Sequence, residues 1–145
     1  MMSRDQQRSR LYAWEDAVVA PLDPSRVSFA AAQGMVDAIW ADQELRYPPR
    51  VTPLPPQSRR CLGDATRLAI RLPPVFPSWL LLHELAHAMS STHDGESDGH
   101  GPVFVGLYVR LLSRYLRLPA TELVSALQSQ GIMLQQDARP VFLDT

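Results

Sequence analysis

Residues 78–104 read SWLLLHELAHAMSSTHDGESDGHGPVF, and the fold and chemistry of the chain are inferred outward from this stretch. It opens on an apolar segment directly after Pro77, a position at which a helix commonly begins. We predict a helix over 78–91, followed by a polar loop over 92–101 that contains three glycines and three acidic residues. A second helix is predicted over 103–116, where apolar residues recur at helical spacing.

The first helix carries the motif His83-Glu84-Leu85-Ala86-His87, an HExxH pattern. Residues four apart return to nearly the same face of a helix, so His83 and His87 can bind one metal ion. Glu84 projects about 100° further around the helix and is left to contact the water that the metal binds. We therefore predict a Zn²⁺ site with His83 and His87 as ligands and Glu84 as the general base that activates the zinc-bound water.

A catalytic zinc site needs a third protein ligand and one open position for water. All four histidines lie within 83–100, and His100 is favoured because it lies after a glycine-rich turn at the start of the second helix. From there it can point back at the first two histidines. His93, Asp94 and Asp98 remain alternatives. Asp98 can equally cap the second helix, and Asp94 and Glu96 can solvate the loop or accept hydrogen bonds from imidazole N–H groups.

The composition describes one compact, soluble unit. The chain has 145 residues, of which 46% are apolar, and this length suits one domain spanning 1–145. Its 14 basic and 15 acidic residues give a net charge of -1, so no global excess favours nucleic acid or an anionic membrane. Cys61 is the only cysteine, which excludes a cysteine-based zinc site and fits a reducing cytoplasm. With no secretory signal or membrane span visible, we expect a cytoplasmic protein.

In the first third of the chain the sequence predicts helical segments and one strand. Residues 11–19 are predicted as a short helix or strand, and 29–45 as an amphipathic helix capped by Ser28. Five prolines over 48–56 leave room for at most one short edge strand, around Val51.

A hairpin is predicted next, because 60–62 and 66–72 can pair across Gly63-Asp64 and the second segment alternates apolar and polar residues. At the other end of the chain a last helix is predicted over 121–130, followed by a tail that we expect as an extended segment on the surface. The fold class is therefore α+β, with a small antiparallel or mixed sheet packed on the active-site helix and on flanking helices.

The sequences HELAHAMSS at 83–91 and DGHGPVF at 98–104 together resemble the SprT-like zinc metalloproteases. In that family HExxH is followed by a variable insert and by an HGxxF-type element whose histidine is the third zinc ligand. The resemblance implies the ligands His83, His87 and His100, Glu84 as general base, and a zincin-like single domain. The runs RDQQRSRLYAWED at 4–16 and HGPVFVGLYVRLL at 100–112 also resemble a group of short, uncharacterised bacterial metallohydrolases.

The expected activity is that of a zinc-dependent hydrolase, a metallopeptidase that cleaves a peptide or protein substrate. Two alternatives are a zinc hydrolase of a non-peptide amide and a zinc-stabilised protein-binding module with little catalysis. SprT-like proteins that act on DNA-crosslinked proteins usually add a cysteine zinc ribbon or basic segments, and this chain has one cysteine and no net positive charge.

In zincin-like folds the strand before the active helix lies along the cleft. Segment 66–72 would therefore offer a free edge to an extended peptide, although an ordinary edge strand is equally consistent with it. No oxyanion-stabilising residue stands out, because Tyr108, Tyr115 and Arg110 are each expected in the core or on the surface.

Overall fold

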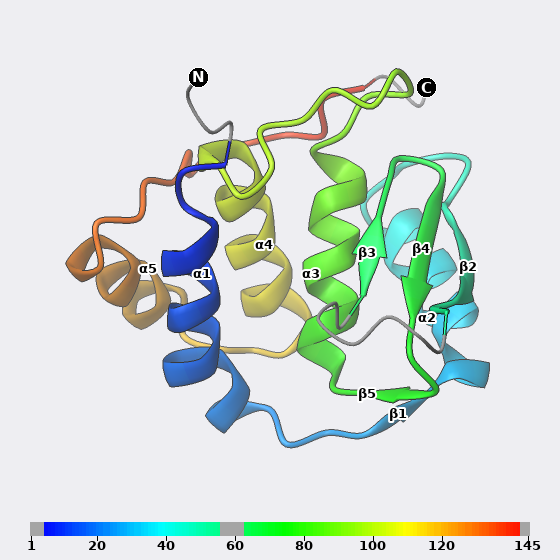
Figure 1. Cartoon of the computed structure of the whole chain (residues 1–145), viewed down its shortest axis with the longest axis horizontal. Helices are drawn as coiled ribbons and strands as arrows, with labels where there is room; N and C mark the ends of the chain where they lie inside the picture. Colours follow the sequence, from blue (N-terminus) through cyan, green and yellow to red (C-terminus); the bar gives the residue numbers. More distant parts are fainter. Residues whose placement is uncertain (1–4, 56–62, 143–145) are drawn as a thin grey trace.

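The computed structural model describes residues 5–55 and 63–142 and has the predicted active helix at its centre (Figure 1). This helix, α3 (Ser78–Met89), follows Pro77, whose extended backbone (ψ 152°) precedes the first turn. Nearly all of its side chains are buried, including polar ones. A helix buried on all sides needs cover on all sides. Here strands of the larger sheet contact one side of it, and α4 (Pro102–Tyr115) contacts the other.

Three short strands form a mixed sheet in the order β2-β4-β3. β2 (Arg50–Pro53) runs parallel to β4 (Ala69–Leu72), and β3 (Asp64–Ala65) pairs with β4 antiparallel. β4 buries Ile70 and Leu72 and turns the residue between them to solvent, as the alternation of a strand requires. The edge strand predicted among the prolines is β2, and its place at the edge suits residues that lack a backbone donor.

The predicted hairpin turn is wrong in position. Asp64 lies in β3, and the chain reverses over 66–68 instead. The hydroxyl oxygen of Thr66 accepts the backbone N–H groups of Leu68 and Ala69, each at 3.2 Å, and this side-chain bonding holds the turn and delays the strand to Ala69. Leu68, predicted on the apolar face, is therefore 56% exposed. The predicted arm 60–62 lies outside the described residues.

A second, two-stranded sheet lies beneath α3 in Figure 1 and leads into α2. In it β1 (Val27–Ser28) pairs antiparallel with β5 (Val75–Phe76). The helix α2 (Phe29–Asp42) begins as predicted after Ser28, but the Ser28 side chain makes no capping bond. The first N–H of the helix donates instead to the carbonyl of Pro74 at 2.8 Å, so pairing of the two strands fixes the helix start.

The end of α2 falls at Asp42, earlier than the predicted position 45. Glu44 has a positive φ of 60°, which a continuing helix does not allow. The indole Nε1 of Trp40 donates to the carbonyl of Arg46 at 2.7 Å and holds the chain in this reversal.

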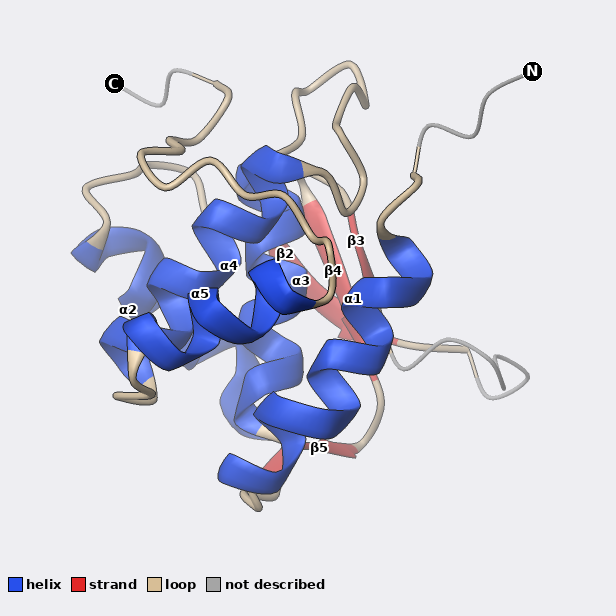
Figure 2. Cartoon of the chain, turned by 90° about the vertical axis from the view of Figure 1, so that its left-hand side faces the viewer, coloured by secondary structure: helices blue, strands red, loops and turns tan. Residues whose placement is uncertain are grey.

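The N-terminal segment, predicted as a helix or a strand, is helical. α1 (Arg8–Trp14) continues into a π-helical turn (Glu15–Val19) and a 3₁₀ turn (Ala20–Leu22). Leu11 and Trp14 of this segment are fully buried. Figure 2 shows α1, α4 and α5 on the near side of the molecule, with the strands β2, β3 and β4 behind them.

The C-terminal part packs more closely than predicted. After α5 (Ala120–Ser129), Gly131 has a φ of 72°, which is typical of the residue that ends a helix. The tail then crosses the ends of two helices: the N–H of Gln135 donates to the carbonyl of Pro102, and that of Val141 to the carbonyl of Met89, both at 3.0 Å. The expected surface segment is thus partly a cover of the core, with Ala138 fully buried.

The tail approaches the backbone of α4 closely at Gly106. A methyl group added to Gly106 would meet the carbonyl oxygen of Gln135 at 1.9 Å. Gly106→Ala is therefore expected to lower the free energy of unfolding by about 1–3 kcal/mol, as overpacking does. The control is Gly34→Ala in α2, where an added methyl meets nothing within 4 Å and a gain of up to about 1 kcal/mol is expected. Urea unfolding of both variants measures the difference, and equal effects would contradict the packing of the tail.

Within the described residues the chain is thus a small mixed α+β domain of five α-helices and two small sheets. The α+β class is confirmed, and the strands of the larger sheet pack on α3 as predicted. No helix in 5–55 or 63–142 combines the length and the apolar character needed to cross a membrane.

Candidate metal centre

The helix α3 brings His83 and His87 together because they lie one turn apart on it. Their Nε2 atoms are 3.2 Å from each other. Most other side chains of this helix are packed in the core, so the backbone that carries the two imidazoles is held in place.

His100 reaches the same point from the loop between α3 and α4. Its Nε2 atom is 3.2 Å from that of His87, and the three histidines offer ligand atoms that all lie within 4.8 Å of one another. Gly99, with a φ of 63°, turns the chain at this place. Asp98 caps α4 by accepting the N–H of Val103 at 2.8 Å, which is the alternative role predicted for it.

The other two alternatives for the third ligand lie elsewhere. His93 and Asp94 are exposed in the loop, and the ring of His93 faces Phe142 at 6.4 Å between centroids. Among the described residues, His83, His87 and His100 form the group whose geometry can hold a metal ion.

Two of the distances between the three nitrogens fit a tetrahedral zinc ion. Zinc binds imidazole nitrogen at about 2.0–2.1 Å, so two such ligands at the tetrahedral angle lie about 3.3 Å apart. The two distances of 3.2 Å to His87 Nε2 match this value. Three neutral nitrogen ligands are also the set used by zinc sites that leave one position for water or substrate.

Two carboxylates from the N-terminal segment hold the imidazoles from behind. The Nδ1–H of His83 donates to Glu15, and the Nδ1–H of His100 donates to Asp5 at 2.6 Å. Asp5 also accepts the backbone N–H of His100 at 3.0 Å. A partner on Nδ1 fixes the tautomer that leaves Nε2 free for a metal.

These two carboxylates were not found from the sequence. The loop residues Asp94 and Glu96 were considered as acceptors for imidazole N–H groups, and for His83 and His100 that expectation is wrong because Glu15 and Asp5 fill the role. In the sequence, Asp5 and Glu15 are marked only as acidic residues at the two ends of a short amphipathic segment. A solvated helix has the same pattern.

Burial and hydrogen bonding act in opposite directions on the pKa of Glu15, and burial has the larger effect. Burial raises the pKa of Glu15 to about 8, while the hydroxyl of Tyr108 donates to its Oε2 at 2.6 Å and acts in the opposite direction. Burial also lowers the pKa of His83 to about 3, so this imidazole is neutral, as a metal ligand must be. Tyr108 is a core residue, as predicted, whose hydroxyl supports the ligand indirectly.

Glu84 lies beside the histidines with one oxygen unsatisfied. It is 3% exposed, and its Oε1 has no hydrogen-bond partner. Burial raises the pKa of Glu84 well above its usual value, and the negative charges of Asp64 and Glu15 add to this. A buried carboxylate oxygen without a donor is costly, so its presence calls for a functional reason.

A pocket of about 270 Å³ opens onto these groups. The three histidines and Glu84 form part of its wall, together with Tyr12 from α1 and Asp64 from β3. Tyr12 is 38% exposed. Burial raises the pKa of Tyr12, a hydrogen bond with Arg8 lowers it, and the charge of Glu84 raises it again.

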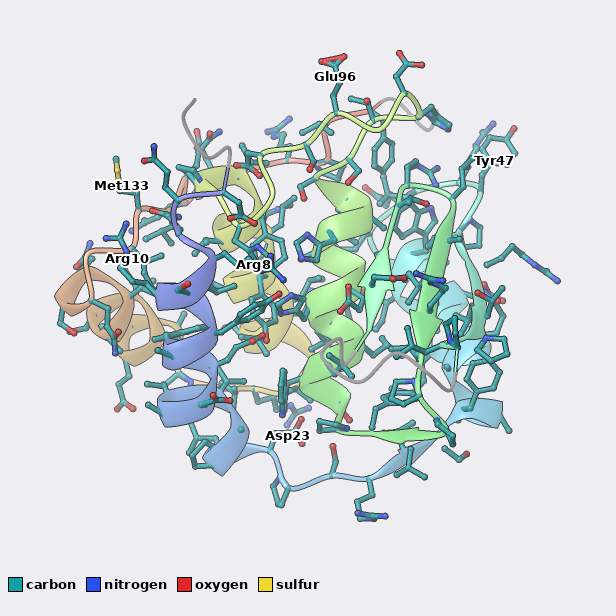
Figure 3. The ribbon with its side chains drawn as sticks, viewed as in Figure 1. Arg8, Arg10, Asp23, Tyr47, Glu96 and Met133 are labelled. Carbon is teal, nitrogen blue, oxygen red and sulfur yellow. The ribbon has the colours of Figure 1, made fainter. Side chains whose placement is uncertain are left out.

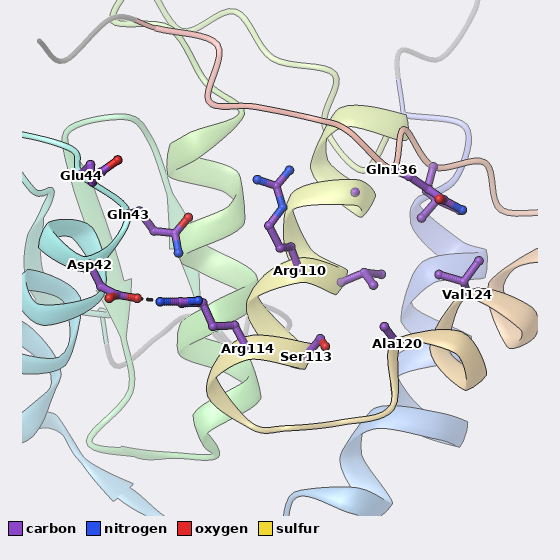
Figure 4. A pocket seen from close by; sticks show the side chains of 12 residues that line it. Asp42, Gln43, Glu44, Arg110, Ser113, Arg114, Ala120, Val124 and Gln136 are labelled. Carbon is purple, nitrogen blue, oxygen red and sulfur yellow. Dashed lines mark hydrogen bonds and ion pairs between the residues drawn. The ribbon is translucent and has the colours of Figure 1, made fainter.

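A larger pocket, of about 780 Å³, lies between the end of α2, α4 and α5 (Figure 4). The ion pair of Arg114 with Asp42 crosses it at 2.8 Å. Tyr115 also bonds Asp42, and Arg110 bonds the carbonyl of Ala138, so these two candidates for oxyanion stabilisation face away from the histidines. No described histidine lines this pocket, whereas His83, His87, His100 and Glu84 line the smaller one.

Comparison with protein-family models, with curated proteins and with solved structures gives no match for this chain.

The carboxylate behind His100 offers a test of the site. Asp5→Asn replaces one of two acceptors by a donor, so His100 loses part of its support and the affinity for zinc is expected to fall by about 10–100-fold. Asp94→Asn, in the exposed loop, should leave the affinity unchanged. Competition with a fluorescent zinc chelator measures both, and equal affinities of the two variants would argue against the metal site.

Proposed function

We propose that the protein is a zinc-dependent hydrolase whose reaction is the cleavage of peptide bonds. The observation that carries the proposal is Glu84, a buried carboxylate with an unsatisfied oxygen in the pocket of three converging histidines. A zinc ion that only fastens two helices has no need of such a group and more often has four protein ligands.

The three histidines and Glu84 have different roles in the proposed reaction. His83, His87 and His100 would hold the ion through Nε2. Bound there, zinc supplies a Lewis acid that acidifies water and polarises a carbonyl group. Glu84 would accept a proton from the attacking water through its carboxylate and pass it to the leaving nitrogen. A cation bound by the three histidines would favour the ionised form of Glu84, against the effect of burial.

The carboxylates Glu15 and Asp5 orient two of the imidazoles and raise their basicity as ligands. Their contacts tie α1 to α3 and to the following loop. The closed arrangement keeps the three nitrogens in place before substrate arrives, which is a condition for efficient catalysis.

The kinship that we propose is with SprT-like metalloproteases of zincin-like fold. It is supported by HExxH at 83–87, by HGPVF at 100–104, and by the α+β arrangement with strands packed on the active helix. Phe104 of the second element packs against all three imidazoles, with ring centroids 4.2 to 5.1 Å away.

The peptide-binding edge predicted from the sequence has to be reassigned. β4 lies in the middle of its sheet, with β2 and β3 on either side, so it has no free edge. The edge next to the pocket is that of β3, whose Asp64 and Ala65 line the pocket wall. An extended peptide would pair with β3 in our proposal.

Metal analysis together with a peptidase assay tests the proposal. Protein purified without chelators should contain about one zinc per chain, and it should cleave a fluorogenic casein or peptide library in a manner abolished by 1,10-phenanthroline. Cleavage of small aryl amides without cleavage of peptides would favour a non-peptide amidase. Zinc at full occupancy without turnover of any substrate would favour a zinc-stabilised binding module.

A further inference from the structure

One face of α1 is turned towards the metal site along its whole length. Arg8 and Tyr12 of α1, and Glu15 directly after it, recur at positions i, i+4 and i+7 and therefore share a side of this helical segment. Glu15 binds His83 at one end of this face, and Asp5, just before the helix, binds His100 at the other. In Figure 3 Arg8 lies between α1 and α3, whereas Arg10 lies on the opposite side of α1.

Tyr12 stands between the two anchored ends. Its ring lies 6.0 Å from the ring of His83 in a stacked arrangement and 5.1 Å from the ring of His100 in an edge contact, measured between centroids. The residue is nevertheless 38% exposed and lines the pocket that Glu84 also lines. By contrast, Tyr108, whose ring also contacts His83, is fully buried. Tyr12 is thus an accessible group within the site.

The hydroxyl of Tyr12 is set up to donate. The Arg8 side chain forms a hydrogen bond with it, and the Arg8 guanidinium lies 5.6 Å from the ring centroid. Arginine has only donors, so the phenol oxygen accepts in this bond and its proton is left for a third group. A phenol keeps its proton at neutral pH, and the adjacent positive charge strengthens it as a donor.

We propose that the Tyr12 hydroxyl donates a hydrogen bond to the carbonyl oxygen of the bond being cleaved and stabilises the negative charge that this oxygen gains. Arg8 positions the hydroxyl. The proton stays on Tyr12 throughout, so no bond of the phenol is broken. A donor already in place costs no reorganisation when charge develops, which makes such groups effective. The inference rests on the proposed hydrolase function. It adds to Glu84, the general base, a second group that stabilises the negative charge on the carbonyl oxygen.

Tyr12→Phe tests the proposal, because it removes the hydroxyl and keeps the ring. The probes are methylphosphonate, a tetrahedral anion with oxygens that can accept from Tyr12, and azide, which can bind the metal without such an oxygen. Both are titrated into the cobalt(II)-loaded protein and followed in its visible spectrum. The variant is expected to bind methylphosphonate about 10–100-fold more weakly, the range for a hydrogen bond to a charged group, and azide unchanged.

The control is Tyr115→Phe, whose hydroxyl bonds Asp42 and Gln43 outside the site, and it should bind both probes like the unaltered protein. With a cleaved peptide, Tyr12→Phe should lower kcat by about 100-fold with little change in KM. If Tyr12→Phe held a full equivalent of metal and bound methylphosphonate with unchanged affinity, the role of Tyr12 would be overturned. The proposed hydrolase function would then still stand. Failure of the unaltered protein to bind metal would overturn the proposed function and this inference together.

Discussion

Replacing Glu84 with glutamine is expected to lower hydrolytic activity by about 10²–10⁴-fold, the usual contribution of a general base. The amide has nearly the same shape and cannot accept the proton of the attacking water. His83, His87 and His100 are untouched, so zinc content should remain at about one per chain. Initial rates of peptide cleavage and metal analysis of the same preparation measure the two quantities.

Stability should move in the opposite direction to activity in this variant. Burial raises the pKa of Glu84 well above its usual value, so folding of the metal-free protein at neutral pH works against the ionised carboxylate, and a neutral glutamine removes this cost. We expect Glu84→Gln to unfold at a higher urea concentration than the unaltered protein when both are metal-free. A functional group that costs stability behaves in this way.

Glu96→Gln is the matched control. Glu96 lies in the exposed loop between α3 and α4 and points away from the body of the molecule in Figure 3. Its replacement should change neither activity nor stability measurably. A fall of activity shared by both variants, or no fall in Glu84→Gln, would show that Glu84 is not the base.

His100→Ala is expected to prevent stable zinc binding. The cluster then retains two nitrogen ligands, and Asp5 loses the ring that it orients. Zinc should fall well below one per chain during dialysis against a moderate chelator. Because a ligand that binds only the folded state stabilises it, the unaltered protein should gain about 4 kcal/mol when free zinc is 1,000-fold above Kd, and the variant should not.

His93→Ala distinguishes His100 from His93, the other histidine considered as the third ligand. His93 is exposed and faces Phe142 rather than the other histidines. This variant should keep both its zinc and its zinc-dependent rise in Tm. If His93→Ala lost zinc while His100→Ala retained it, the arrangement of the metal centre would have to be rejected.

The helices were predicted well where the sequence carries a local cause. α3 and α4 begin after a proline or a glycine and hold a dense apolar face, and both were placed within two residues of their observed bounds. The edge strand β2 was placed from its prolines for the same reason. Segment 66–72 was misjudged because its alternation fits a longer strand, and the bonds of Thr66 that prevent it are visible only in space.

The position of the C-terminal tail could not be predicted from the sequence either. Residues after Gly131 have no periodic pattern, so the sequence offers no reason to place them. Gly106 and the carbonyl of Gln135 meet because an absent side chain on α4 leaves room for a backbone. Contacts of this kind depend on the shapes of two distant segments and have no counterpart in local propensity.

The sequence by itself determined the α+β class and the candidate group His83, Glu84, His87 and His100, because helical periodicity and short spacing act within one stretch of chain. The tertiary structure decided which loop residue meets the first two histidines and which carboxylates stand behind the imidazoles. It also decided which tyrosine enters the pocket. Asp5, Tyr12 and Glu15 are separated from α3 by the two small strands, α2 and the larger sheet. Only the burial of α1 against the core brings them to the site, since apolar contacts such as those of Leu11 and Trp14, and no local preference, fix where that helix lies.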